Sequence, residues 1–143
     1  MSLQLNKDLL RPMAVLASWT FVMETWMYST RLPAISEYNI RTDPEHIRSD
    51  MQNKVPLSIR QVADNYNHLH EQPQVFYAVS IALALLGDRH PYTRTAAWSY
   101  VSVRVVHSIY QALSNKVMTR LKIFVASSFV LAGLTGRLAQ LVF

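Results

Sequence analysis

The chain has 143 residues, of which 50% are hydrophobic and only 16% are charged, and its formal net charge is +5. Soluble domains usually carry about 25% charged residues, so the composition indicates a membrane protein. The absence of cysteine excludes disulfides, thiolate metal sites and a cysteine nucleophile. No nucleic-acid-binding motif accompanies the positive charge, which we therefore attribute to membrane topology and lipid contact.

Four long apolar segments each reach or approach the roughly 20 residues that a membrane-spanning helix needs. Together with the helix-forming residues beside them, they predict helices at about 10–30, 57–87, 92–113 and 117–142. The predicted fold is all-α and occupies one domain, residues 1–143. It is an integral membrane bundle of four helices that run alternately up and down. A signal peptide is the alternative for the first segment, but no A-x-A-like cleavage motif follows it.

Residues 31–66 form the only long connection between these helices. This connection contains three prolines, Pro33, Pro44 and Pro56, and we expect them to exclude a continuous helix there. No helix-breaking residue lies between Leu57 and Pro73, so the second helix should begin near Leu57, within this stretch.

The remaining connections are short. Pro73 lies inside the second predicted helix and should kink it, a defect that membrane helices tolerate. GDRHPY, residues 87–92, predicts a tight turn, and a brief break at 114–116 should separate the last two helices.

Four spans would place both termini on one side of the membrane. The first loop and the junction of the last two helices would share the other side, with eight Lys and Arg residues against five on the terminal side. The positive-inside rule then places the first loop in the cytoplasm.

Polar side chains recur three and four residues apart on three of the predicted helices, so that each set shares one helix face. The sets are Glu24, Tyr28 and Arg31; Asp64, Asn67, Glu71 and Gln74; and Tyr100, Arg104, His107 and Gln111. A charge near the bilayer centre costs at least ~2.5 kcal/mol. These groups are therefore either structural pairs, such as Glu71 with Arg104, or parts of a functional site.

The histidines outside these sets carry less information. We interpret His46, His68 and His90 as solvated residues near helix ends or in loops. His68 and His70 point to different faces of one helix, so we expect no metal site that combines them with Glu71.

Two motifs resemble the MAPEG family, the membrane-associated proteins in eicosanoid and glutathione metabolism. DNYNHLHEQPQVFY, from Asp64 to Tyr77, resembles the N-x-x-E…P-x-x-F signature of that family. RVVHSIY, residues 104–110, with Arg120 sixteen residues after Arg104, resembles the R-x-x-H…Y…R pattern of its prostaglandin E synthase branch. The uncharacterised bacterial branch is the most similar in these motifs. The chain departs from the better-known members in having Ala63, Asp64 and Asn65 where they carry an arginine before the Asn.

The resemblance implies a homotrimer that binds glutathione between neighbouring subunits near the cytosolic face. It implies that Arg120 is the catalytic residue and acts on the glutathione thiol. It assigns the rest of the glutathione contacts to Arg31, Asn67, Glu71, Arg104, His107 and Tyr110. It also implies a multi-pass protein of the bacterial inner membrane, with the first loop cytoplasmic.

The function that follows from the resemblance is a glutathione-dependent transferase or peroxidase acting on lipophilic small molecules that partition from the bilayer. One alternative is a non-catalytic membrane subunit that uses its polar faces for assembly, for a partner or within a larger membrane complex. Another is a small proton or solute carrier built around Glu71 and His107, although the chain lacks the internal repeats typical of carriers.

Overall fold

The computed structural model describes residues 5–143, and in this range the chain is helical, with no strand. The prediction of an all-α fold is therefore confirmed. The elements are η1 (Lys7–Leu9), α1 (Leu10–Glu37), α2 (Ile47–Lys54), α3 (Leu57–His68), α4 (Pro73–Leu85), α5 (Pro91–Leu113) and α6 (Val117–Val142). The bounds of α5 and α6 agree with the predicted helices at 92–113 and 117–142, and α3 begins at the expected residue.

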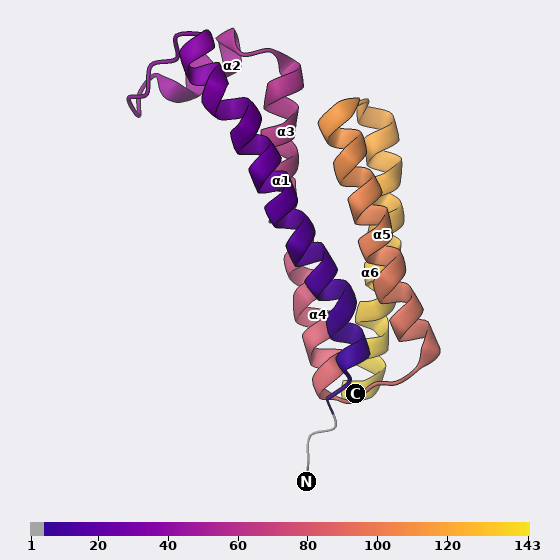
Figure 1. Ribbon diagram of the computed structural model, residues 1–143. Helices are drawn as coiled ribbons and strands as arrows, with labels where there is room; N and C mark the ends of the chain where they lie inside the picture. The colour runs from indigo at the N-terminus through magenta and orange to yellow at the C-terminus, as the bar shows by residue number, and fades with distance from the viewer. Residues whose placement is uncertain (1–4) are drawn as a thin grey trace.

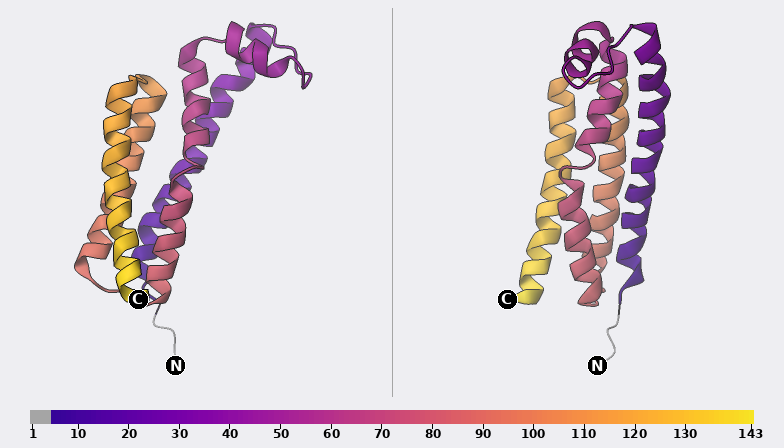
Figure 2. Two further views of the ribbon diagram at one scale, coloured as in Figure 1. Left: turned by 180° about the vertical axis from the view of Figure 1, so that it is seen from behind. Right: turned by 90° about the vertical axis from the view of Figure 1, so that its left-hand side faces the viewer.

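The long helices lie roughly parallel to one axis (Figures 1 and 2). The first two, α1 and α3, pack along each other, while α5 packs along α6, and α4 lies against α6 and the start of α1. The short helix α2 and the α5–α6 turn occupy one end of the molecule. The N-terminal segment (residues 5–9), the α4–α5 turn and the C-terminus occupy the other (Figure 1). Towards the α2 end the α1–α3 pair diverges from the α5–α6 pair.

The first helix is longer than predicted. It continues through Pro33 to Glu37 instead of ending near residue 30, so the predicted end of this helix is wrong, whereas residues 31–66 do not form one continuous helix, as expected. Proline removes only one N–H from the helix ladder, and Pro33 is exposed near the helix end, where water can reach the freed carbonyl. The helix ends at Glu37, and two residues later Asn39, with a φ of 50°, lets the Ile40 N–H reach the Ile35 carbonyl at 3.0 Å.

The second predicted helix is broken, not kinked. α3 ends at His68, and α4 begins at Pro73 after a short turn. Proline has no N–H for the Leu69 carbonyl, and its ring would clash with that carbonyl in a continuous helix. As the first residue of a new helix, however, proline is well suited. One proline therefore divides the predicted segment 57–87 into two helices.

The connection between α1 and α3 is organised around one buried carboxylate. Asp50, in α2, accepts hydrogen bonds from the Arg41 guanidinium at 2.9 and 3.0 Å and from Lys54 Nζ at 2.9 Å. The Arg41 hydrogen bond is the main reason why the pKa of Asp50 lies far below its usual range, and Lys54 adds to the effect. This arrangement ties α2 to the segment that follows α1.

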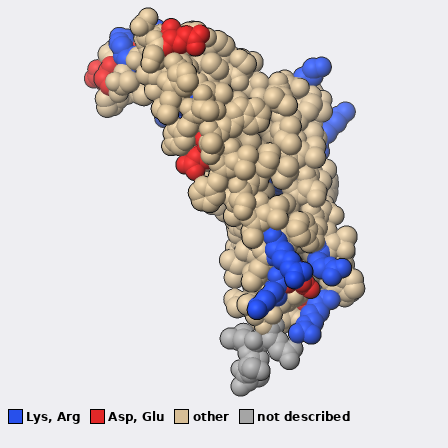
Figure 3. Space-filling model, viewed as in Figure 1, with Lys and Arg blue, Asp and Glu red and all other residues tan. Residues whose placement is uncertain are grey.

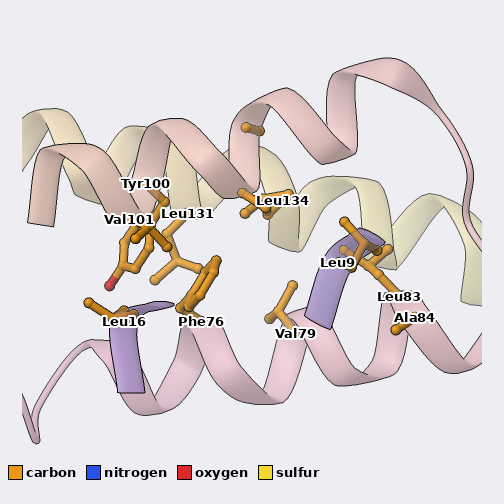
Figure 4. Packing of buried hydrophobic residues seen from close by; sticks show 12 residues of the cluster. Leu9, Leu16, Phe76, Val79, Leu83, Ala84, Tyr100, Val101, Leu131 and Leu134 are labelled. Atoms are coloured by element: carbon orange, nitrogen blue, oxygen red, sulfur yellow. The ribbon is translucent and has the colours of Figure 1, made fainter. Parts of the chain in front are cut away.

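The apolar core lies where α1, α4, α5 and α6 meet (Figure 4). Phe76 of α4 stacks on Tyr100 of α5 with ring centroids 4.5 Å apart, and Leu16, Leu83 and Leu134 belong to the same buried cluster. Large apolar side chains also cover the outside: Phe21 is 68% exposed and Phe129 is 75% exposed. An outer surface of this kind is typical of a protein that contacts lipid or other subunits. Among the described helices, α6 alone has the length and hydropathy of a membrane span.

An ion pair with a buried carboxylate, Asp88 with Arg137, lies at the end of the molecule that contains the α4–α5 turn and the C-terminus. Asp88, in the α4–α5 turn, accepts hydrogen bonds from Arg137 at 3.0 and 3.2 Å and from the Thr93 hydroxyl at 2.6 Å. Burial disfavours the carboxylate, but the hydrogen bonds from Arg137 and Thr93 outweigh it and lower the pKa of Asp88 from 3.8 to about 2. The pair ties the α4–α5 turn to α6.

We expect Asp88→Asn to lower the Tm at neutral pH, because it removes the charge that Arg137 binds. A carboxyl whose pKa falls on folding stabilises the protein above its unfolded pKa, here by about 2 kcal/mol, and this is lost as the pH falls from about 4 to about 2. The Tm of the wild type should therefore drop across this range more than that of Asp88→Asn, as followed by circular dichroism in detergent. Asp8→Asn, at an exposed ion pair with Arg11, is the matched control. Equal Tm values for Asp88→Asn and the wild type would contradict the role of this pair.

Candidate functional site

The most deeply buried charge in the molecule is Arg104. Its side chain has no exposed surface, yet it lies in the middle of α5. Its Nη2 donates to the His68 carbonyl at 3.3 Å, and its guanidinium lies 5.6 Å from the centre of the Phe124 ring. Within residues 5–143, Nε and Nη1 have no hydrogen-bond partner. The break after α3 thus supplies the acceptor that an arginine at this depth needs, and the ring adds a cation–π contact.

Two imidazoles lie beside this guanidinium. The rings of His68 and His107 are 5.2 Å apart, and His107 Nε2 lies 3.1 Å from Gln111 Oε1. His68 Nδ1 lies 2.7 Å from the carboxylate of Glu71, which is 66% exposed. Glu71 therefore pairs with His68 and not with Arg104, and the cluster runs from the surface at Glu71 to the buried His107.

Sequence analysis missed part of this cluster. His68, interpreted as solvated, has a side chain that is only 22% exposed. Gln61 and Asn65 are also buried: Gln61 donates to the Ala112 carbonyl at 2.7 Å, and Asn65 donates to the Ser108 hydroxyl at 2.7 Å. Their spacing, four and then three residues, is a helix-face signal as good as that of Asp64, Asn67 and Glu71.

The predicted set on α3 faces outward instead. Asp64 and Asn67 are exposed, and together with Arg31 they line an open cavity of about 530 Å³ between α1, α2 and α3. Two arginines that sequence analysis did not select, Arg48 and Arg60, line the same cavity. Arg60 Nε is buried and has no partner among the described residues. The cavity therefore combines three guanidinium groups, one carboxylate and the Asn67 amide.

Arg120 and Tyr110 are not among the described residues that line this cavity. Arg120, in the first turn of α6, donates to Asn115 Oδ1 at 2.8 Å. Asn115 has a φ of 48° and closes the α5–α6 turn, where the Tyr110 carbonyl accepts its N–H at 3.0 Å. The predicted site residues thus fall into three groups within the chain: the cavity, the buried cluster and the α5–α6 turn.

One surface group has the composition of a cation site. Asp43, Glu45 and His46 bring their ligand atoms within 4.8 Å of one another before α2. The Asp43 carboxylate already accepts the His46 N–H at 3.0 Å. The start of α2 therefore accounts for this arrangement without a metal.

Comparison with known proteins identifies the family. The family model described as MAPEG family matches residues 9–140, nearly the whole chain. Searches of curated proteins and of solved structures gave no match. The matched range contains both motifs, the cavity and the buried cluster. The chain belongs to the MAPEG family, the membrane-associated proteins in eicosanoid and glutathione metabolism.

Proposed function

We propose that this protein is a membrane-embedded glutathione-dependent transferase or peroxidase that acts on lipophilic electrophiles. The observation that carries the proposal is the composition of the cavity between α1, α2 and α3. Glutathione has two carboxylates, one ammonium and one thiol. A pocket for it needs at least two guanidinium groups and one carboxylate.

The cavity offers this set of groups. Arg31, Arg48 and Arg60 can take the two carboxylates, since a guanidinium binds a carboxylate through two parallel hydrogen bonds. Asp64 lies on the same face of α3 as Arg60 and Asn67, and it can take the ammonium while Asn67 binds the peptide backbone. The unpaired Nε of Arg60 favours an anionic ligand, because a buried donor without a partner is costly. Arg60 also supplies a guanidinium one turn before the position where better-known members carry theirs.

Glu71 is the second carboxylate within the motif, and it lies outside this cavity beside His68. Arg104 and His107 are buried behind it and hold the end of α3 through the His68 carbonyl and ring. In the proposed site Glu71 contacts glutathione at the rim, and Arg104 and His107 are positioning residues.

We further propose a homotrimer in which each protomer crosses the membrane four times. The four spans are α1, the broken pair α3 and α4, then α5, and finally α6. The α5–α6 turn lies at the same end of the molecule as the cavity, but its Arg120 does not line the cavity of its own protomer (Figure 1). A neighbouring subunit would bring its Arg120 and Tyr110 to this cavity. The Lys and Arg distribution supports a cytoplasmic location for this end.

The chemistry assigned to Arg120 is stabilisation of the thiolate. A thiol with a pKa of about 8.5 is mostly protonated at neutral pH, and a nearby guanidinium favours the ionised form. In conjugation, the sulfur forms a bond to the electrophilic carbon. The displaced electron pair leaves with the leaving group or with the oxygen of an opened ring, which then takes up a proton. In peroxide reduction, the thiolate attacks one peroxide oxygen and the O–O bond breaks, giving a sulfenic acid and an alkoxide that takes up a proton and leaves as the alcohol. The thiol of a second glutathione then attacks the sulfenic acid, which forms the disulfide and releases water.

The second candidate is a non-catalytic membrane subunit with the same fold. The burial of Arg104 and His107 inside one protomer favours it, because these polar groups then serve packing and not a ligand. Glutathione binding separates the two candidates.

Isothermal titration calorimetry of the detergent-solubilised protein should show glutathione binding at millimolar or better affinity. Arg60→Gln and Asp64→Asn should each weaken it by roughly 1–3 kcal/mol, the cost of leaving a charged group without its partner. Glu71→Gln should have a smaller effect if Asp64 binds the ammonium. Arg89→Gln, an exposed arginine at the opposite end, is the matched control and should bind as the wild type does. No heat with the wild type would favour the non-catalytic subunit.

Arg120→Lys should leave glutathione affinity nearly unchanged but remove most thiolate formation, read from ultraviolet absorbance on adding glutathione. Lysine keeps the charge and lacks the planar fork that holds a thiolate and a substrate oxygen together. Asn115→Gly removes the Arg120 contact and tolerates the positive φ of the turn. This control should form thiolate, so it separates a role on the sulfur from a role in the turn. Full thiolate formation by Arg120→Lys would reject the catalytic assignment.

Co-expression of Arg60→Gln with Arg120→Lys tests the shared site. If each site combines Arg60 of one subunit with Arg120 of its neighbour, about a quarter of all interfaces carry both native residues when the two variants assemble at random. At a glutathione concentration that saturates the wild type but not Arg60→Gln, each variant alone should form little thiolate, and co-expression should raise thiolate formation to about that level, with trimers in native mass spectrometry. A stable monomer, or mixed trimers without recovery, would contradict the intersubunit site.

A further inference from the structure

A second cationic hollow lies at the other end of the molecule, between the N-terminal segment and the α4–α5 turn. It has a volume of about 490 Å³, and Lys7, Arg89 and Arg94 contribute its positive charges. Figure 3 shows Lys and Arg side chains gathered at this end, near the N-terminus. None of these residues belongs to the glutathione site proposed above.

The walls of this hollow are held by hydrogen bonds. The Asn6 backbone N–H donates to the Ala84 carbonyl at 3.0 Å, and its side-chain amide donates to the Asp88 carbonyl at 2.6 Å. The Asn6 side-chain oxygen accepts the Asp8 N–H at 3.0 Å. The opposite wall is the start of α5, where His90 accepts the Tyr92 N–H at 3.2 Å. The N-terminal segment is thus fixed against the turn.

The charges in the hollow are not balanced. Across residues 5–143, none of Lys7, Arg89 and Arg94 forms an ion pair, and all three are exposed. The neighbouring carboxylates are already engaged: Asp8 pairs with Arg11 at 3.2 Å, and Asp88 pairs with Arg137 at 3.0 Å. The hollow therefore presents three cations to an anion from outside the protein.

The position of the hollow indicates the source of that anion. The 26 residues of α6 span roughly 39 Å at 1.5 Å per residue, which exceeds the roughly 30 Å hydrocarbon core of a bilayer. Its C-terminal end, next to Asp88 through Arg137, then lies at headgroup depth. Apolar side chains adjoin the hollow: Leu5 lines it, and Trp98, one turn after Arg94 on α5, is 38% exposed. The acyl chains of a lipid whose phosphate occupies the hollow can therefore lie along α5.

We propose that this hollow binds the phosphate headgroup of an anionic phospholipid. Arg89 and Arg94 bind the phosphate oxygens from the α4–α5 side, and Lys7 binds from the N-terminal segment. The guanidinium and ammonium groups by themselves would bind any phosphate. The apolar side chains beside the hollow favour a lipid over a soluble phosphate.

The test is native mass spectrometry of the full-length protein in detergent, titrated separately with phosphatidylglycerol and phosphatidylcholine. The wild type should retain phosphatidylglycerol preferentially. The double variant Arg89→Gln/Arg94→Gln should lose this preference by about fivefold for each arginine, the scale of one basic side chain at an anionic surface. Lys116→Gln/Lys122→Gln removes the same charge at the other end and should keep the preference. Asp8→Asn removes the one carboxylate that lines the hollow and should strengthen it.

Equal losses in both double variants would overturn the proposal, because they would show a general charge effect. Equal retention of the two lipids by the wild type would also overturn it. Displacement of phosphatidylglycerol by millimolar inorganic phosphate would reject the lipid in favour of a soluble phosphate. Circular dichroism of each variant should match the wild type, because the substituted side chains are exposed.

Discussion

The break between α3 and α4 is the constraint on which the rest of the structure depends. Pro73 cannot donate to the Leu69 carbonyl, so the helix ends at His68 and restarts after four residues. In a low-dielectric interior, backbone groups released in this way must find partners. Within the break the His68 carbonyl accepts the Glu71 N–H at 3.3 Å and also accepts Arg104 Nη2 at 3.3 Å, so the turn supplies an acceptor to the buried guanidinium in the middle of α5.

The same break also ties the two halves of the molecule together. Gln72, within the break, donates to Ser128 of α6 at 2.7 Å and accepts from Tyr100 of α5 and Ser127 of α6 at 3.4 Å. On the other side of the break, Asn65 and Trp19 both donate to the Ser108 hydroxyl. These bonds fix the rotation of α3, and that rotation turns the Arg60, Asp64 and Asn67 face of α3 toward α1 and α2.

Two cationic hollows result, at opposite ends of one small helical protein, and their surroundings differ. The hollow beside α2 combines arginines with a carboxylate and amides, a mixture suited to a zwitterionic, water-soluble molecule. The hollow beside the α4–α5 turn has cations and apolar neighbours, and its carboxylates are engaged in ion pairs. The first arrangement fits a co-substrate from the aqueous phase, whereas the second fits a component of the membrane.

The sequence by itself determined the all-α class, the bounds of α5 and α6, the start of α3 and the family, because long apolar segments, turn residues and short motifs are local signals. Tertiary structure decided the rest. Gln61, Asn65 and His68 recur at helical spacing just as Asp64, Asn67 and Glu71 do, and only packing against α5 buried Gln61 and Asn65. Periodicity gives the angle between side chains on one helix. It does not give the rotation of that helix against its neighbours, which depends on contacts between residues far apart in the chain.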